Sequence, residues 1–330
     1  MFYRTEKAYA KINLYLDITG KREDGYHDLL TIMQIVNLCD EVDISLNMTK
    51  QLSVSMVNSI IDLPQEKNIA YIAAKKFYDS LYFTPVSGAD ICIKKNIPMA
   101  AGLAGGSADA AAVLRGLNYL YGKPFTTKEL CQIGMEIGSD VPFCIVGGTQ
   151  VCRNKGEVTY DMEGIQGYSL VIVSSGSKQS TAEQYKKLDE KYNNFKDYTC
   201  GKNYGDLFGA FSVGKCSQAF PLMFNIFEDL YEDDENIKKT KSIMYDYGAR
   251  VAMICGSGPS VFGVFDDFLY AEDAQEGLLK EGIHSFVCRP INKRYDQIVP
   301  GERLWRWIKR IGKVFLNIIY EPIIQNANFV

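Results

Sequence analysis

The segment that decides the fold is Pro98-Met-Ala-Ala-Gly-Leu-Ala-Gly-Gly-Ser-Ala-Asp109, in which small residues run directly into a helical pattern. Small side chains let the backbone come close to a ligand. The free N–H groups and the positive dipole end of a helix favour phosphate. On composition alone, a tight strand-to-helix turn is the alternative. We interpret the segment as a phosphate loop that opens a helix.

Two better-known phosphate loops do not match this chain. A Walker A loop needs Gly-Lys followed by Ser or Thr, and no Gly-Lys pair here is followed by either residue. A dinucleotide fingerprint needs G-x-G-x-x-G with an acidic residue about 20 positions later. Gly102 and Gly105 stand in the wrong frame, and Glu129 is better explained as a helix-capping residue. Both alternatives are therefore excluded.

The flanking sequence mixes strands and helices. Residues 7–18 alternate strictly between apolar and polar side chains, which is typical of a half-buried strand and puts Lys11 and Asn13 on one polar face. Helices are indicated by apolar spacing and by capping boxes at 126–129 and 180–183. The other strands are expected near 42–46, at 89–94, at 170–173 and on both sides of a glycine turn at 256–259. The helices are expected at 68–82, at 107–121, at 126–137, from residue 180 onward, and at 237–247.

Composition excludes several classes of protein. The chain has 330 residues and a hydrophobic share of 47%, as expected of a soluble globular protein with room for two domains. A net charge of −4 argues against a nucleic-acid binder that must neutralise many phosphates. Two histidines and nine scattered cysteines without a C-x-x-C pair provide no metal site and indicate reduced thiols in a cytoplasmic protein. We find no signal peptide and no membrane-spanning run.

Four blocks of the sequence resemble the GHMP kinases, a family that includes galactokinase, homoserine kinase and mevalonate kinase. They are Ala10-Lys-Ile-Asn-Leu-Tyr-Leu16, Gly20-Lys-Arg-Glu-Asp-Gly-Tyr-His-Asp-Leu29, the segment from Ile97 to Ala112, and Gly138-Ser-Asp-Val-Pro-Phe143. The segment from Gly256 to Gly263 looks like the second glycine motif of the family. The resemblance spans roughly residues 5–292. It implies an α+β fold, the two-domain GHMP kinase fold with the active site in the interdomain cleft, and transfer of a phosphoryl group from ATP to an alcohol.

The resemblance implies a catalytic pair. Asp140 would be the general base that takes the proton from the substrate hydroxyl, and Lys11 beside it would favour the ionised carboxylate and steady the developing charge. Taken singly, Lys11 would be a strand-edge lysine in solvent and Asp140 an aspartate capping the turn before Pro142. The joint presence of the four blocks favours the catalytic interpretation.

The resemblance also implies the binding residues. Gly102, Gly105, Gly106 and Ser107 would hold the phosphates of ATP, with Mg²⁺ bridging those phosphates. Further nucleotide positions are implied at Asn68, Lys95, Pro98, Leu103 and Asp109. The second block is specific to the branch of the family whose substrate carries a cytidine, so Tyr26 would stack on the cytosine and His27 would form hydrogen bonds to it. Asn13 and Thr181 look like further contacts to this small-molecule substrate.

The expected domains are 1–163, which carries the phosphate loop and the catalytic residues, and 164–292, a smaller C-terminal GHMP domain. Residues 293–330 lie outside the resemblance and form a basic amphipathic tail. We expect the tail to pack on the protein itself or on a partner subunit, and contact with a membrane surface is the alternative. The sequence is compatible with a monomer or a homodimer.

Two rival functions follow from the same residues. Another GHMP kinase, acting for instance on homoserine or mevalonate, would share the phosphate loop, but the Gly25-Tyr-His27 block argues against it. A non-catalytic nucleotide-binding protein would share the fold, since fold alone does not fix activity. The presence of both Lys11 and Asp140 argues against that rival.

Overall fold

The computed structural model describes residues 2–58, 64–154, 158–174, 180–196, 198–199 and 203–295. Residues 1–293 form one compact unit and residues 294–330 a second one. The tail predicted at 293–330 lies outside the described residues, apart from its first three positions. All the helices and strands that the structure describes belong to the first unit.

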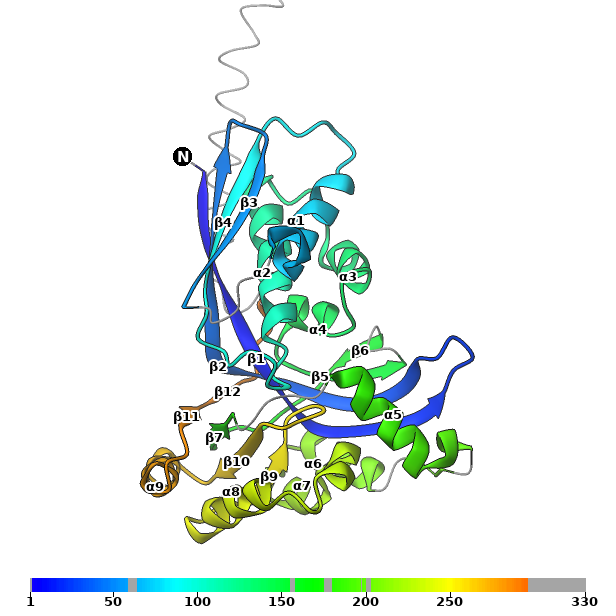
Figure 1. Ribbon diagram of the computed structural model, residues 1–330, viewed down its shortest axis with the longest axis vertical. Coiled ribbons are helices and arrows are strands. Elements are labelled where there is room, and N and C mark those ends of the chain that lie inside the picture. The colour runs from blue at the N-terminus through cyan, green and yellow to red at the C-terminus, as the bar shows by residue number, and fades with distance from the viewer. Residues whose placement is uncertain are drawn as a thin grey trace, which may run out of the picture. The chain divides into compact units, whose positions relative to one another are not determined.

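A large mixed sheet forms one layer of this unit (Figure 1). Its main path runs β3-β4-β2-β1-β8, and β5 and β12 also pair with β2 while β6 pairs with β5. The strands of this sheet are β1 Tyr3–Lys21, β2 His27–Asn47, β3 Leu52–Val57, β4 Gly88–Lys94, β5 Thr149–Asn154, β6 Val158–Asp161, β8 Phe224–Asn225 and β12 Pro290–Ile291. β1 pairs with β2 along most of its length, but with the short edge strand β8 only at Tyr15 and Leu16.

The strand predicted at 7–18 is present within β1, but the expectation that it is half-buried is wrong over its central part. From Ala10 to Ile18 both faces are buried. The apolar face packs in the core, and on the polar face Lys11 and Asn13 are buried as well, at 5% and 2% exposure. The glycine segment lies alongside β1 at this point, because the backbone N–H of Lys11 donates to the carbonyl of Leu103 at 3.1 Å. Alternation predicts which side chains share a face, but not whether another segment covers that face.

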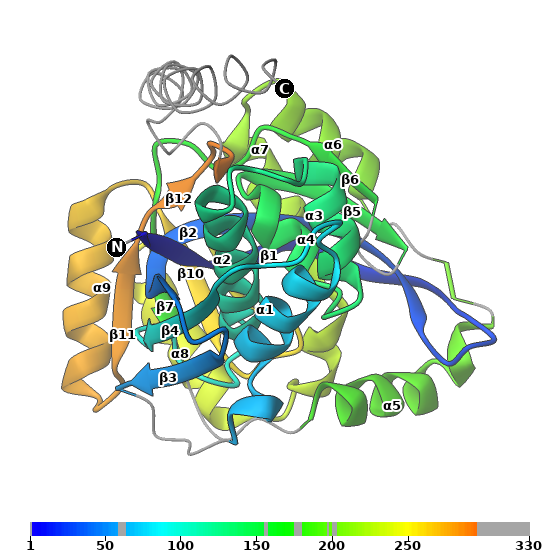
Figure 2. The same ribbon diagram turned by 90° about the horizontal axis from the view of Figure 1, so that it is seen from above.

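Four helices pack on one side of the large sheet (Figures 1 and 2). They are α1 Ile69–Asp79, α2 Gly105–Leu120, α3 Thr127–Met135 and α4 Val141–Val146. The helices predicted at 68–82, 107–121 and 126–137 are confirmed, and the capping box between Thr126 and Glu129 is formed. The sequence did not indicate α4, because this helix has only six residues and follows the point near Gly138 where the helical pattern of α3 ends.

A second, antiparallel sheet has the order β11-β7-β10-β9. Its strands are β7 Ser169–Val173, β9 Val251–Ile254, β10 Val261–Phe265 and β11 Ser285–Cys288. Alternate residues of β7 serve two cores: Leu170 and Ile172 face the core shared with β1 and β2, while Val171 and Val173 pack against the helices α8 Glu235–Asp246 and α9 Phe268–Lys280. The strand predicted at 170–173 is confirmed as β7. The two strands predicted on either side of the glycine turn at 256–259 are confirmed as β9 and β10.

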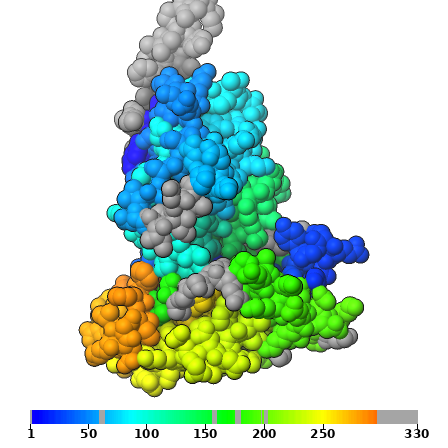
Figure 3. Space-filling view, in the orientation of Figure 1, coloured from blue at the N-terminus to red at the C-terminus, as the bar shows by residue number. Residues whose placement is uncertain are grey.

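The remaining helices lie in the chain between β7 and α8, except η1, which precedes α1. They are α5 Thr181–Lys191, α6 Tyr204–Ser212 and α7 Cys216–Ala219, with 3₁₀ turns η1 Gln65–Lys67, η2 Asn193–Phe195, η3 Phe220–Leu222 and η4 Ile226–Leu230. The predicted capping box between Ser180 and Glu183 opens α5. Figure 3 shows the tip of the β1–β2 hairpin standing out beside α5. Within the described ranges, no helix is long and apolar enough to cross a membrane.

Candidate active site

A pocket of about 520 Å³ lies where these elements meet, a volume typical of small-molecule sites. Its wall is built by β1, the start of α1, the glycine segment with the first turn of α2, the start of α4, α5 and the second glycine turn. Residues from both sides of the predicted division at 163/164 therefore line one site. Most of the predicted site residues are among them; the exceptions are Leu103, Tyr26 and His27.

The glycine segment reaches α2 through backbone conformations that small residues tolerate. Gly102 has φ +78°, and Ala104, the residue before α2, has φ +56°. No side chain caps the N-terminus of α2. The N–H groups of its first turn, at Gly105, Gly106 and Ser107, thus face the pocket without a capping side chain, as an anion site requires.

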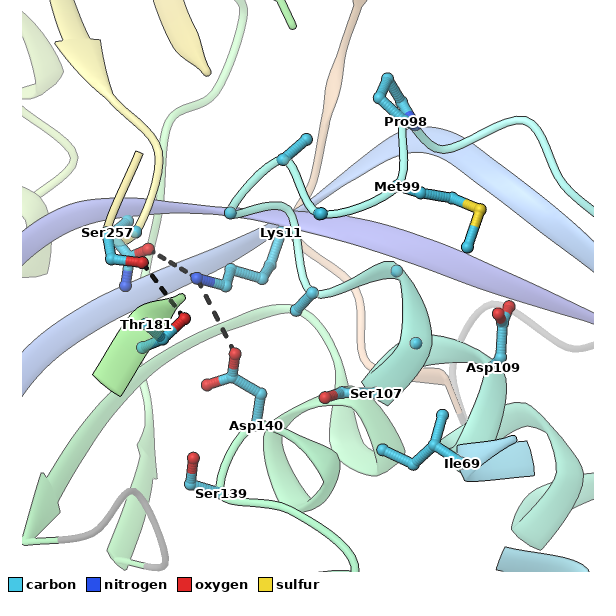
Figure 4. A pocket seen from close by; sticks show the side chains of 18 of the residues that line it. Lys11, Ile69, Pro98, Met99, Ser107, Asp109, Ser139, Asp140, Thr181 and Ser257 are labelled. Atoms are coloured by element: carbon cyan, nitrogen blue, oxygen red, sulfur yellow. Dashed lines mark hydrogen bonds and ion pairs between the residues drawn. The ribbon is translucent and has the colours of Figure 1, made fainter. Parts of the chain in front are cut away.

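Lys11 and Asp140 face each other across the pocket (Figure 4). Lys11 Nζ lies 3.9 Å from Asp140 Oδ2, and the lysine side chain is 6% exposed while the aspartate side chain is 37% exposed. Asp140 precedes α4, yet its side chain makes no capping hydrogen bond. The two alternatives, a lysine in solvent and a turn-capping aspartate, are both wrong. A buried ammonium beside an accessible carboxylate is the arrangement that proton abstraction from a bound hydroxyl needs.

A short hydrogen-bonded chain fixes the ammonium. Lys11 Nζ donates to Asn13 Oδ1 at 2.8 Å, and Asn13 Nδ2 donates to Thr31 Oγ1 at 2.9 Å. Thr31 donates in turn to the carbonyl of Tyr15 at 2.6 Å. Asn13 is 2% exposed, so it holds Lys11 in one position more firmly than a solvated side chain would.

The second glycine turn, residues 256–259, lies against the glycine segment and Lys11. A Cβ atom on Gly102 would stand 2.2 Å from the carbonyl oxygen of Cys255, and a Cβ atom on Gly256 would stand 3.1 Å from Lys11 Nζ. Ser257 Oγ lies 3.4 Å from Thr181 Oγ1 at the start of α5 (Figure 4). Glycine at these two positions therefore allows two backbones from distant parts of the chain and the ammonium to meet.

The predicted nucleotide residues Asn68, Lys95 and Asp109 also line the pocket. Asn68 Oδ1 accepts a hydrogen bond from the N–H of Ala70 at 2.9 Å and so caps α1. Lys95 Nζ donates to Asp109 Oδ2 at 2.6 Å and also to Asp40 Oδ2. Asp40, which the sequence did not single out, is fully buried. Burial, with a smaller contribution from Asp40 and against the opposing effect of Lys95, raises the pKa of Asp109 to about 8.

Tyr26 and His27 lie at the tip of the β1–β2 hairpin, outside the residues that line the pocket. Tyr26 is exposed, whereas His27 is buried and stacks on Tyr185, with the ring centroids 4.7 Å apart. His27 Nε2 is 2.7 Å from Asp189 Oδ1 in α5. Tyr185 lines the pocket, so His27 contacts the site through this aromatic ring.

Asp189 joins the hairpin to α5, and nothing in the sequence pattern indicated it. Burial raises its pKa, but hydrogen bonds from Lys21 and His27 outweigh burial and hold the pKa below its usual value. The carboxylate is therefore ionised, and His27 Nε2 donates to it as an N–H. Lys21 Nζ donates to the other oxygen at 2.8 Å.

Leu103, predicted near the nucleotide, has its side chain in the core and is 1% exposed. Leu103 contacts the site through its backbone, because its carbonyl oxygen accepts a hydrogen bond from the backbone N–H of Lys11. Sequence reasoning missed several residues of the pocket wall, namely Ser139, Tyr185, Phe227 and Ser257. Ser139 and Ser257 lie inside motifs that the sequence had singled out, whereas Tyr185 and Phe227 had no such signal.

Comparisons with known proteins identify the family of the chain. Family models match residues 68–148 as the GHMP kinases N terminal domain and residues 218–284 as the GHMP kinases C terminal region. A 4-diphosphocytidyl-2-C-methyl-D-erythritol kinase of Clostridium novyi (strain NT) is 41% identical over 292 residues, which cover 88% of this chain and 100% of that relative. One of the same name from Caldicellulosiruptor saccharolyticus is 39% identical over 287 residues, covering 86% of this chain and 96% of that relative.

Solved structures of the same family are also similar to this chain. The crystal structure of a 4-(cytidine 5'-diphospho)-2C-methyl-D-erythritol kinase has a TM-score of 0.71 and 26% sequence identity, and the match covers 86% of this chain and 98% of that one. A homoserine kinase from Cytophaga hutchinsonii, at 18% identity and a TM-score of 0.69, shares the fold. The chain therefore belongs to the GHMP kinase family, in the group of its 4-diphosphocytidyl-2-C-methyl-D-erythritol kinases.

Proposed function

We propose that the protein transfers the γ-phosphoryl group of ATP to the 2-hydroxyl of 4-diphosphocytidyl-2-C-methyl-D-erythritol, a step of the non-mevalonate route to isoprenoid precursors. The observation that carries the proposal is the Lys11–Asp140 pair, which stands in one pocket with the uncapped first turn of α2. The names of the relatives supply the substrate.

The residues divide the chemistry between them. Asp140 takes the proton as the substrate oxygen attacks the γ-phosphorus, the bond from that phosphorus to the β,γ-bridging oxygen breaks, and ADP leaves. Lys11, held by Asn13, lies beside the developing negative charge. The N–H groups of Gly105, Gly106 and Ser107 bind phosphate oxygens, so most of the catalysis is positioning and charge neutralisation.

Magnesium fits this site as an ion carried on the ATP phosphates. In kinase sites it keeps several waters and takes one or two carboxylates from the protein. We therefore expect the ion to be held chiefly by the ATP phosphates and by water, so that the carboxylate of Asp140, which is accessible in the pocket, stays available to accept the proton. When bound, the ion neutralises charge on the transferred phosphoryl group.

A coupled ADP-release assay with a panel of alcohols tests the proposal. We expect ADP release with the cytidine diphosphate substrate and little with homoserine or mevalonate. Activity with one of the other alcohols alone would assign a different GHMP kinase. Nucleotide binding without activity on any alcohol would favour the non-catalytic alternative.

Substitution of Asp189 tests the proposed cytidine end of the site. Asp189→Ala removes the carboxylate that His27 and Lys21 share, so the stacking of His27 on Tyr185 is the main contact left between the hairpin tip and α5. We expect KM for the cytidine substrate to rise roughly 10- to 100-fold, the value of one charge-assisted hydrogen bond, with KM for ATP unchanged. Glu190→Ala, at the exposed neighbouring position in α5, is the matched control. An equal rise in both KM values would show that Asp189 only stabilises the fold.

A further inference from the structure

A buried cluster of three charged side chains lies directly behind the phosphate loop. Lys95 Nζ donates to Asp109 Oδ2 at 2.6 Å and to Asp40 Oδ2, and the exposed fractions of the three side chains are 6% for Lys95, 6% for Asp109 and 0% for Asp40. Lys95 Nζ lies 3.6 Å from the point where a Cβ atom of Gly105 would stand. Any net charge in this cluster therefore acts on the groups that would hold phosphate.

The formal charges of the cluster do not cancel, because two carboxylates share one ammonium. An uncompensated buried charge costs several kcal/mol in a protein interior, and a buried group usually takes or loses a proton instead. A second anion here would also repel the phosphates of a nucleotide. Both considerations favour one proton held between the two carboxylic groups.

The hydrogen bonds indicate which carboxylic group keeps the proton. Asp40 Oδ1 accepts the backbone N–H groups of Asn96 at 2.5 Å and Ile97 at 2.8 Å, in addition to the ammonium on Oδ2. These donors stabilise an ionised carboxylate. Asp109 Oδ2 has the ammonium, but Asp109 Oδ1 is buried and accepts no hydrogen bond. The proton therefore belongs to Asp109.

We propose that nucleotide binding at this site is proton-linked: Asp109 is a protonated carboxylic acid in the state that binds nucleotide, and loss of its proton puts a net negative charge behind the phosphate loop and weakens binding. The inference rests on the proposed function, because it takes the loop as the phosphate site.

The groups that face Asp109 from the neighbouring elements agree with this assignment. Burial raises its pKa to about 8, Lys95 after β4 opposes the rise, and Asp40 in β2 adds to it. In α4, burial raises the pKa of the Cys144 thiol, which is therefore neutral. The ionisation of Asp109 thus falls within an accessible pH range.

Binding of ADP to the full chain between pH 7 and pH 9.5 tests the proposal. Nucleotide phosphates titrate near pH 6 and stay ionised over this range. If only the protonated state binds, the Kd of wild type rises only about twofold from pH 7 to pH 8 but about tenfold from pH 7 to pH 9. Asp109→Asn mimics the neutral acid, so its Kd for ADP should not change with pH, even if that Kd differs from the wild-type value at pH 7.

Glu41→Gln is the matched control, because it removes a surface acid of β2 that pairs with Lys94. Its Kd for ADP should depend on pH in the same way as that of wild type.

A nucleotide-free measurement separates this inference from the proposed function. Because the folded-state pKa of Asp109 is raised, the stability that it contributes is fully present below the unfolded-state pKa and is lost as the pH rises through about 8. The Tm of wild type should therefore fall relative to that of Asp109→Asn between pH 6 and pH 9.5. A constant difference in Tm, or parallel pH dependence of the two Kd values, would overturn the proton linkage. Absence of ADP binding at every pH together with the expected Tm shift would instead leave the proton on Asp109 and overturn its link to a nucleotide.

Discussion

Replacing Asp140 with asparagine is expected to lower kcat by about 10²–10⁴-fold, the contribution of a general base, while the Kd for ATP stays close to that of wild type. Asparagine has nearly the same shape but cannot take the proton of the substrate hydroxyl. The side chain of Asp140 makes no capping hydrogen bond, so its amide analogue removes no bond that holds α4. Steady-state ADP release and a separate ATP titration measure the two quantities.

The control for this prediction is Asp246→Asn, an exposed aspartate at the end of α8. It makes the same chemical change far from the pocket and should have no effect on kcat. An Asp140→Asn protein with wild-type kcat and unchanged Tm would remove Asp140 from the mechanism. A fall in kcat that merely follows a fall in Tm would point to a structural role.

The second large effect is expected at Gly102. Gly102→Ala would place a Cβ atom 2.2 Å from the carbonyl oxygen of Cys255, at a backbone φ of +78°. The left-handed conformation costs about 1–2 kcal/mol for an alanine, and forcing the two backbones apart adds about 1–3 kcal/mol. We therefore expect the free energy of unfolding to fall by about 2–5 kcal/mol, together with weaker ATP binding, because the glycine segment must move away from the second glycine turn.

Gly122→Ala is the matched control, since Gly122 has φ +80° but no atom lies within 4 Å of the position of its Cβ. It carries the same conformational cost without the collision. Urea denaturation of the two variants isolates the collision as the difference between their unfolding free energies. Equal losses would show that the contact between the two glycine segments contributes nothing to stability.

Local signals predicted much of the fold. The small residues from 98 to 109 and the apolar spacing after them predicted α2, and the capping boxes at Thr126 and Ser180 predicted the starts of α3 and α5. Such patterns depend on residues within one helical turn, so they survive in any tertiary context. The short α4 and the marginal strands β5, β6 and β8 depend on their neighbours for stability and left no comparable pattern.

Motifs also predicted the residues that line the middle of the pocket, but not the residues of α5 that contact His27. Lys11, Asn13 and Asp140 stand in blocks that resemble a known family, and the structure brings them into one pocket. Asp189 and Tyr185 come from a helix whose polar and aromatic residues look ordinary in sequence. Their contacts with His27 cross more than 150 positions of the chain, and no local pattern carries such information.

The sequence by itself predicted the class of fold, the glycine segment that we propose binds phosphate, and the two residues that we propose for catalysis, because each prediction follows from short-range spacing or from a motif. Only the tertiary structure decided that the polar face of β1 is buried, that Gly102 and Gly256 meet, and that Lys95 is shared by Asp40 and Asp109. Burial, close approach and the count of charges within hydrogen-bonding distance are properties of segments brought together in space. The protonation of Asp109 is set by that packing, since a carboxyl group keeps its proton when its surroundings exclude water and provide too few donors.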